Sequence, residues 1–539
     1  MITADIVLEN GPVWCGLAEG EQDAVALWQG LVLATGTREA VGALKGPATR
    51  VIDLGGRFAM PGLYDAHMHL LPLGLAMDCV DARYEAAPSI AALVEAIRAR
   101  AATQAPGTWV LARGYDQGRW QEGRHPSVDD LDRAAPEHPV YLVRACGHVG
   151  VVNSAAMRLA GLTPETPTPP GGLIERGPDG RLTGLLAENG RDAVHAVLPA
   201  ATHENLVAAI EGAGRACLRL GITSVMDAAV GTQGGRAELA AYRTAERSAR
   251  LPVRTLQCLM GGSRGIAAEA VAEGLVTGTG SDLLRVGPVK IFTDGSAGGK
   301  TAAMSEPYLG VPETHGVLCL TDEECHAEIA HYHAAGCQMA IHAIGDVAIE
   351  QVLSGYEKAL AAQPDPTRRH RIEHCGFLSE GQLARMRSHA ILPAPQPSFL
   401  REFGDLYLQV VGEVRTAPSY PMRAWIEAGL HPSASTDAPV TDLDPLANLH
   451  AMVTRATRSG RVIGADQVLS REEALHAYTW AAAYGGREEH RKGRLVPGQL
   501  ADVAVFSHDL RHVEAAALLG EVACEMTILG GEIVYERGG

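Results

Sequence analysis

The middle of the chain alternates short apolar segments with helix-like segments, and this alternation restricts the fold more than any other feature of the sequence. Eight segments read as buried strands, at residues 58–64, 222–230, 253–260, 284–293, 338–343, 370–374, 390–395 and 431–435. Helical patterns lie between most of them, for example at 205–220, 321–335 and 346–362. Parallel strands need long crossover connections, usually helices. Eight strands joined in this way predict an α/β fold, a (β/α)₈ barrel of the TIM type.

The two ends of the chain have a different character from the middle. Short strands separated by turns are expected at 4–8, 24–28, 31–34 and 50–54, and again at 501–506, 526–529 and 533–535. Chain termini often lie close together, so we expect a small β-sandwich domain built from residues 1–57 and 490–539. The barrel then takes 58–489. The gap between its first two strands is too long for one crossover, which predicts an insertion at about 75–215 after barrel strand 1.

Composition excludes several classes of partner. The 539-residue chain carries a formal net charge of −17, which argues against nucleic acid and anionic membranes. No segment has the length of uncharged apolar sequence that a membrane span needs, and the N-terminus has no signal-peptide pattern. The ten cysteines form no CxxC motif and read as reduced thiols. We therefore expect a cytoplasmic protein that acts on a small molecule, with a homodimer as one alternative for its assembly.

Two histidines follow the first predicted barrel strand. His67 and His69 are two residues apart, so on an extended strand both imidazoles point to one side. Imidazole is the commonest metal ligand among side chains, and Pro61-Gly62 lets the backbone turn just before the pair. The alternative is chance pairing in a chain with 21 histidines. The other strand ends help to separate these two interpretations.

Further ligand-type residues stand at the ends of later strands, where barrel enzymes place their reacting groups. These residues are Lys290, His342, His374 and Asp437. Each histidine alone could be an ordinary core residue, but four histidines and an acid on strand ends predict a divalent metal site. Imidazole and oxygen donors favour Zn²⁺, with Mn²⁺, Co²⁺ or Fe²⁺ as alternatives. One ion or two would fit this pattern.

Lys290 is unusual because it lies inside an apolar strand. Burial lowers the pKa of a lysine, so a neutral amine becomes available to take up carbon dioxide. The resulting carbamate is an anionic oxygen donor able to bridge two cations. The alternative is an ordinary ammonium paired with an aspartate such as Asp294.

These groups predict hydrolytic chemistry. A metal-held water becomes a hydroxide near neutral pH. Asp437 could take its proton on attack and return it to a leaving nitrogen.

Several segments together resemble the amidohydrolase superfamily. They are Pro61-Gly62-Leu63 through His69, the segments of His342, His374 and Asp437, and residues 493–502. Within the superfamily the chain is most similar to the YtcJ-like group, which includes N-substituted formamide deformylases. The motifs that carry this similarity lie at 113–117, 147–154, 183–188, 289–296, 301–303 and 342–346.

The resemblance assigns roles to the same residues. It implies that the metal ligands are His67, His69, Lys290, His342 and His374, with Lys290 carboxylated. Asp437 would be the final ligand or the proton shuttle. Two departures concern the substrate: Gly150-Val151 follows the His148 dipeptide where an aromatic residue is common, and Lys300 replaces the usual arginine.

Residues of the insertion are candidates for substrate binding. The insertion is expected to cover the barrel mouth, and Tyr115, Asp116, His148 and Asn153 are polar residues in glycine-bounded loops. The alternative is that Asp116 and Asn153 only cap turns or helices.

The leading hypothesis is metal-dependent hydrolysis of a C–N amide bond in an N-acyl or N-formyl amine. A second hypothesis keeps the site but changes the substrate to a cyclic amide, an ester or a deaminated amine. A third is a catalytically silent barrel used for assembly or sensing. The complete ligand set argues against the third.

Overall fold

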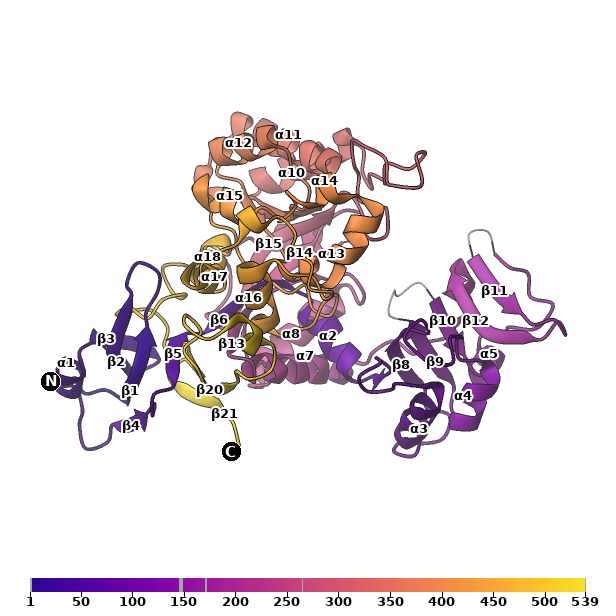
Figure 1. Ribbon diagram of the computed structural model, residues 1–539, viewed down its shortest axis with the longest axis horizontal. Coiled ribbons are helices and arrows are strands. Elements are labelled where there is room, and N and C mark those ends of the chain that lie inside the picture. The colour runs from indigo at the N-terminus through magenta and orange to yellow at the C-terminus, as the bar shows by residue number, and fades with distance from the viewer. Residues whose placement is uncertain (1, 145–148, 170–171, 264, 539) are drawn as a thin grey trace. The chain divides into compact units, whose positions relative to one another are not determined.

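The computed structural model describes residues 2–144, 149–169, 172–263 and 265–538 (Figure 1). The chain divides into two compact units. One contains Met1–Leu71 with Ile210–Gly539, and the other is Pro72–Ala209. In the described ranges, no helix combines the length and apolar character required to cross a bilayer.

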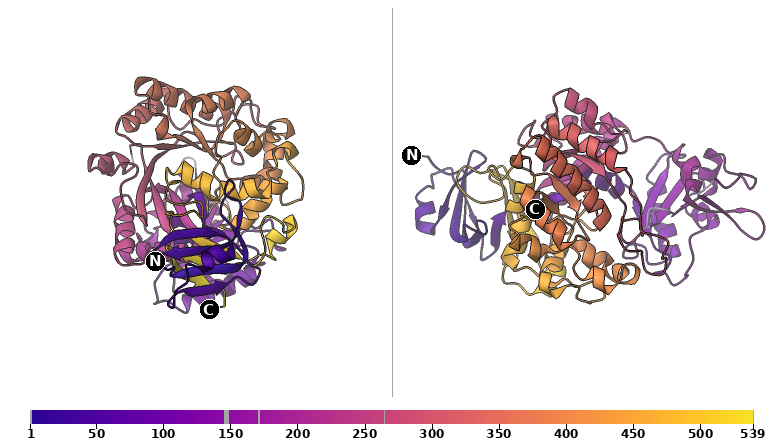
Figure 2. Two further views of the ribbon diagram at one scale, coloured as in Figure 1. Left: turned by 90° about the vertical axis from the view of Figure 1, so that its left-hand side faces the viewer. Right: turned by 90° about the horizontal axis from the view of Figure 1, so that it is seen from above.

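The larger unit contains a barrel of seven parallel strands that lie inside a ring of helices (Figure 2). In spatial order the strands are β18 (Leu392–Ala394), β17 (Arg371–His374), β16 (Met339–Ala343), β15 (Leu284–Phe292), β14 (Arg254–Met260), β13 (Ile222–Val230) and β6 (Leu63–Met68). Both faces of these strands are almost entirely buried, as expected of a parallel sheet covered by helices. The predicted α/β barrel is therefore confirmed.

Helices connect the barrel strands. The main ones are α7 (His203–Leu218), α8 (Arg236–Arg247), α10 (Asp322–Ala334), α11 (Asp346–Ala362), α12 (Glu380–His389) and α13 (Ser398–Val410). Helix α10 begins with a capping box, in which Thr321 and Glu324 satisfy each other's backbone N–H groups. Shorter helices of the chain are α1 (Arg38–Gly42), α2 (Leu70–Met77), α9 (Ala267–Ala272), α14 (Glu413–Thr416), α15 (Met422–Glu427), α16 (Pro445–Thr454), α17 (Arg471–Ala477) and α18 (Trp480–Gly485).

The first predicted barrel strand was wrong in one respect, because residues 58–64 belong to two sheets. Strand β5 (Phe58–Pro61) pairs with β19 (Val503–Phe506) outside the barrel, and β6 starts only at Leu63. Gly62 separates them. A Cβ atom at this position would lie 2.2 Å from the Thr223 hydroxyl, so only glycine allows this close approach.

The last predicted strand, residues 431–435, is not a regular strand. Its backbone nevertheless closes the barrel between β18 and β6. Ser433 N donates to Pro393 O at 3.5 Å, and Ala66 N donates to Ala434 O at 3.3 Å. Asp437 N then donates to His67 O at 2.8 Å. These bonds are too scattered to form a ladder, which explains why the segment lacks strand geometry.

The two ends of the chain pair in one eight-stranded sheet, which we call the end sheet. Its strands are β1 (Ile6–Trp14), β2 (Glu21–Trp28), β3 (Leu31–Gly36), β4 (Arg50–Asp53), β5, β19, β20 (Cys524–Leu529) and β21 (Glu532–Glu536). Leu8 and Val25 from the start of the chain share a core with Val503 and Ile528 from its end. Burial of this common core is what joins the termini.

A buried ion pair links the end sheet to the barrel. Arg254 of β14 donates to both carboxylate oxygens of Asp502, at 2.6 and 2.8 Å. Asp502→Asn would leave the guanidinium without its counter-charge, and we expect it to lower the free energy of unfolding by about 3–5 kcal/mol, measured by urea titration. Glu525→Gln, which removes one partner of the more exposed Glu525–Arg537 pair, should cost less than about 1 kcal/mol. Equal losses for both variants would contradict this prediction.

The smaller unit is an α/β unit with its own sheet, in the order β11 (Gly172–Arg176), β12 (Leu182–Glu188), β10 (Val149–Val152), β9 (Val140–Arg144), β8 (Val110–Tyr115) and β7 (Val80–Asp81). Helices α3 (Ile90–Ala101) and α4 (Val128–Ala134) share one core with Val151, whereas α5 (Ser154–Leu159) shares another with Val152. Successive strand residues point to opposite faces, so this sheet has a core on each side. A short helix, α6 (Asp192–His195), lies near the end of the unit.

Candidate metal centre

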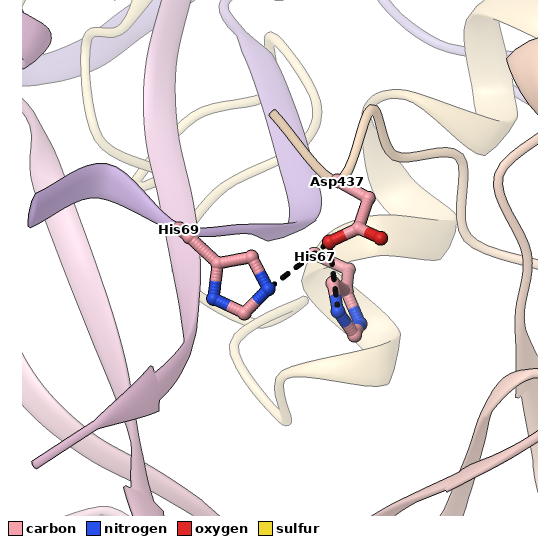
Figure 3. A group of neighbouring side chains, drawn as sticks. All are labelled: His67, His69 and Asp437. Carbon is pink, nitrogen blue, oxygen red and sulfur yellow. Dashed lines mark ion pairs between the residues drawn. The ribbon is translucent and has the colours of Figure 1, made fainter. Parts of the chain in front are cut away.

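His67, His69 and Asp437 converge at the end of β6 (Figure 3). Oδ1 of Asp437 lies 3.5 Å from Nε2 of His67 and 3.1 Å from Nε2 of His69. The potential donor atoms of all three residues lie within 4.8 Å of one another. Asp437 has a left-handed backbone (φ 58°), and its N–H bonds to His67 O, which holds its carboxylate beside the histidine pair. One cation could contact all three side chains.

Two further histidines lie beside this group. His374 ends β17, and its ring centroid is 4.9 Å from that of His67. The ring centroid of His342, in β16, lies 4.4 Å from that of His374. The structure therefore brings together the four histidines that the sequence selected.

Lys290 of β15 is completely buried, and its amine has no hydrogen-bond partner among the described residues. Burial lowers the pKa of this amine. Its charge in turn contributes to the lowered pKa values of His67 and His374. The amine lies over the ring of Phe292, 4.7 Å from its centroid. A buried amine with a lowered pKa has the property that carbamate formation requires.

The alternative partner for Lys290 is already engaged elsewhere. The carboxylate of Asp294 accepts the backbone N–H groups of Ala303, Ile344 and Gly345 at 2.9, 3.0 and 2.9 Å. It also lies 3.2 Å from Nε2 of His342. The alternative to the carbamate, an ammonium paired with Asp294, is not formed among the described residues, and this carboxylate instead organises the loops around His342.

In each of His67, His374 and His342, one ring nitrogen contacts an acceptor group of the protein. Nδ1 of His67 contacts the Glu373 carboxylate, and Nδ1 of His374 bonds Gln396 Oε1 at 2.5 Å. A nitrogen that donates must carry the proton, so the other nitrogen keeps its lone pair. Nε2 of His67 and Nε2 of His374 therefore keep lone pairs that can bind a cation. For His342, Nε2 faces Asp294 and Gly295 O, and the available atom is Nδ1, which is buried with no hydrogen-bond partner in the part of the chain that the structure describes.

The charge states suit cation binding. Burial, reinforced by the Lys290 charge, lowers the pKa of His67 well below its ordinary value. Burial and the neighbouring His342 do the same for His374. Burial alone would raise the pKa of Asp437, but its hydrogen bond with His69 and the nearby positive charges hold it below the ordinary value. Neutral imidazoles and an ionised carboxylate are the forms that bind metals.

Sequence reasoning missed Glu373 and Gln396, which orient His67 and His374. It named Asp294 only as a partner for Lys290, whereas this carboxylate lies beside His342. The signal was present for Glu373, because it is a charged residue inside an apolar strand, as Lys290 is. Gln396 lies in an irregular segment after β18, where no periodicity marks an inward direction.

The candidate substrate residues Tyr115 and Asn153 are buried within the smaller unit. Tyr115 stacks on Trp120, and its hydroxyl lies 2.9 Å from Nδ1 of His125. Asn153 caps α5 and also accepts the N–H of Val140 at 2.9 Å. Their internal contacts agree with a structural role, and substrate binding by these residues stays a prediction.

Of the other two candidate substrate residues, the structure describes only Asp116. Oδ1 of Asp116 accepts the N–H of Gly118 at 3.1 Å and a guanidinium N–H of Arg144 at 2.9 Å, as in a turn cap that is also ion-paired. His148 lies outside the described residues.

Comparison with known proteins decides the family. A family model described as "Amidohydrolase family" matches residues 50–535. The chain belongs to the amidohydrolase family. Its match includes all six proposed metal-site residues and almost the whole of both units.

Relatives of this amidohydrolase match over nearly its full length. The putative amidohydrolase YtcJ of Bacillus subtilis is 29% identical over 541 residues, which cover 98% of this chain and 99% of the relative. An N-substituted formamide deformylase of Arthrobacter pascens is 29% identical over 525 residues, covering 96% and 95%. The resemblance to the YtcJ-like group is therefore confirmed.

A solved structure agrees with this assignment. An uncharacterized metal-dependent hydrolase from Pyrococcus horikoshii OT3 superimposes with a TM-score of 0.79 and 27% sequence identity. The match covers 95% of this amidohydrolase and 99% of the archaeal chain. The barrel, the end sheet and the inserted unit thus recur in a related hydrolase.

Proposed function

We propose that this amidohydrolase uses a divalent metal to hydrolyse the C–N bond of a small N-acyl or N-formyl amine. The observation that carries the proposal is the convergence of His67, His69 and Asp437. The amine of Lys290, which is completely buried and has no hydrogen-bond partner among the described residues, supports it. The N-formyl class is favoured first because one relative is named an N-substituted formamide deformylase.

The residues fit a divalent cation. His67, His374 and His342 each keep one ring nitrogen for a cation, and His69 lies beside the Asp437 carboxylate. Lys290 as a carbamate would add further oxygen donors. This mixture of nitrogen and oxygen favours Zn²⁺ over Mn²⁺, Co²⁺ or Fe²⁺, and either one or two ions are compatible with it. A bound cation would polarise the amide carbonyl and lower the pKa of water.

Asp437 performs the proton transfers. Its carboxylate is ionised before reaction, so it can accept a proton from the water that attacks the carbonyl carbon. It then gives this proton to the nitrogen as the C–N bond breaks. The hydroxyl group of water goes to the acyl carbon and its proton to the amine. The products are a carboxylic acid, formic acid for an N-formyl substrate, and a free amine.

The test is a metal analysis followed by a substrate panel. We expect the purified protein to contain a divalent metal and to cleave N-formyl or N-acyl amines. His67→Ala should remain folded by circular dichroism but lose both metal and activity. Cleavage of cyclic amides, esters or aromatic amines in place of open-chain amides would contradict the proposed substrate class. A folded protein that takes up no metal would support a silent barrel and overturn the proposal.

A further inference from the structure

A fully buried ion pair lies inside the barrel beneath the candidate metal centre. Arg371 and Glu373 of β17 are 0% and 1% exposed. The guanidinium binds the carboxylate with two hydrogen bonds, Nε to Oε1 at 2.7 Å and Nη2 to Oε2 at 2.9 Å. A buried ion pair is weak evidence for stability, because desolvation offsets the attraction between the charges. Stability alone therefore does not account for this ion pair.

Glu373 and Arg371 contact β6, the strand that carries His67, across the barrel interior. Oε2 of Glu373 contacts Nδ1 of His67, and Nη2 of Arg371 donates to Ala66 O at 2.9 Å. Strands β17 and β6 are not neighbours in the sheet, so these contacts pass through the interior. The pair thus holds both the ring of His67 and the backbone just before it.

We propose that Glu373, fixed by Arg371, is a positioning residue that sets the orientation and tautomer of His67. The carboxylate keeps the proton on Nδ1, so the lone pair of Nε2 points to the side where Oδ1 of Asp437 lies, 3.5 Å away. Arg371 supplies the counter-charge and restricts the carboxylate to one plane. The inference rests on the proposed function, because it takes His67 to be a metal ligand.

Glu373→Gln tests the pair with almost no change in side-chain size. We expect its affinity for Zn²⁺ and Co²⁺ to fall about 10- to 100-fold, measured by competition with a chromophoric chelator. The visible spectrum of the Co²⁺-loaded protein should change as well, because the spectrum depends on ligand geometry.

A second variant separates positioning from stability. Arg371→Met with Glu373→Gln removes both buried charges, so it leaves no uncompensated guanidinium. We expect this double variant to unfold at a higher urea concentration than Glu373→Gln alone. Its metal affinity should stay low, because the acceptor carboxylate for His67 is still missing.

Asp502→Asn is the matched control, since it breaks a similar buried arginine–carboxylate pair away from the centre. It should lose stability but keep the metal affinity and Co²⁺ spectrum of the parent protein. If the parent binds metal and both Glu373 variants bind it equally well, the positioning role is overturned and the proposed function stands. If the parent itself binds no metal, both proposals fail.

Discussion

Asp437→Asn should lower kcat by about 10²- to 10⁴-fold, the usual contribution of a general acid–base group. The amide of asparagine has nearly the shape of the carboxylate but cannot take up a proton from water. Steady-state kinetics on the amide identified by the substrate panel would measure the effect, with metal content determined on the same sample. The loss of kcat should be much larger than any loss of metal content.

Asp466→Asn provides the comparison for this variant, because Asp466 is an exposed carboxylate in a short 3₁₀ helix, Ala465–Gln467. It should leave kcat unaltered. Two results would count against a proton shuttle: an Asp437→Asn enzyme with the parent kcat, or one whose lost activity is fully explained by lost metal. The second result would make Asp437 a ligand only.

Lys290→Met should have opposite effects on metal binding and on the stability of the metal-free protein. Methionine fills a similar volume but cannot form a carbamate, so metal uptake should be lost. The same change removes a buried amine that has no hydrogen-bond partner among the described residues. The free energy of unfolding of the metal-free protein should therefore rise by about 1–3 kcal/mol. Elemental analysis and urea titration measure the two quantities.

Lys492→Met is the contrasting variant, because Lys492 is also buried but has a partner. Its Nζ lies 2.8 Å from Oε2 of Glu488. Replacement would leave this carboxylate without its counter-charge, and the free energy of unfolding should fall by about 3–5 kcal/mol. A loss of stability in Lys290→Met as large as that in Lys492→Met would show that Lys290 is a structural residue, and normal metal uptake by Lys290→Met would exclude a carbamate ligand.

The barrel was predictable because strand-like and helix-like segments alternate regularly along the chain. Buried parallel strands are continuous apolar runs, and the spacing of His67 and His69 fixes their common side without knowledge of the partner strands. The boundary at Gly62 was not predictable, because it depends on contact with Thr223, a residue far away in the chain. Tertiary contacts of this kind leave no local pattern.

The candidate site likewise has a part that could be predicted from the sequence and a part that could not. Residues that stand at strand ends could be selected from the sequence, because the barrel brings those ends together. The orienting contacts could not be selected, since Glu373 meets His67 across the barrel interior and Asp294 acts through backbone groups of other loops. The sequence predicted an insertion at about 75–215 but not that this region has cores of its own, because its strands are short and its sheet mixes parallel and antiparallel pairs.

The position of β5 has a consequence for synthesis on the ribosome. This strand pairs with β1 on one side and with β19 on the other. While the ribosome is still making the barrel, one edge of β5 has no partner, and it stays open until β19 has been translated. Open strand edges invite pairing with other chains. We therefore expect products truncated before β19 to aggregate.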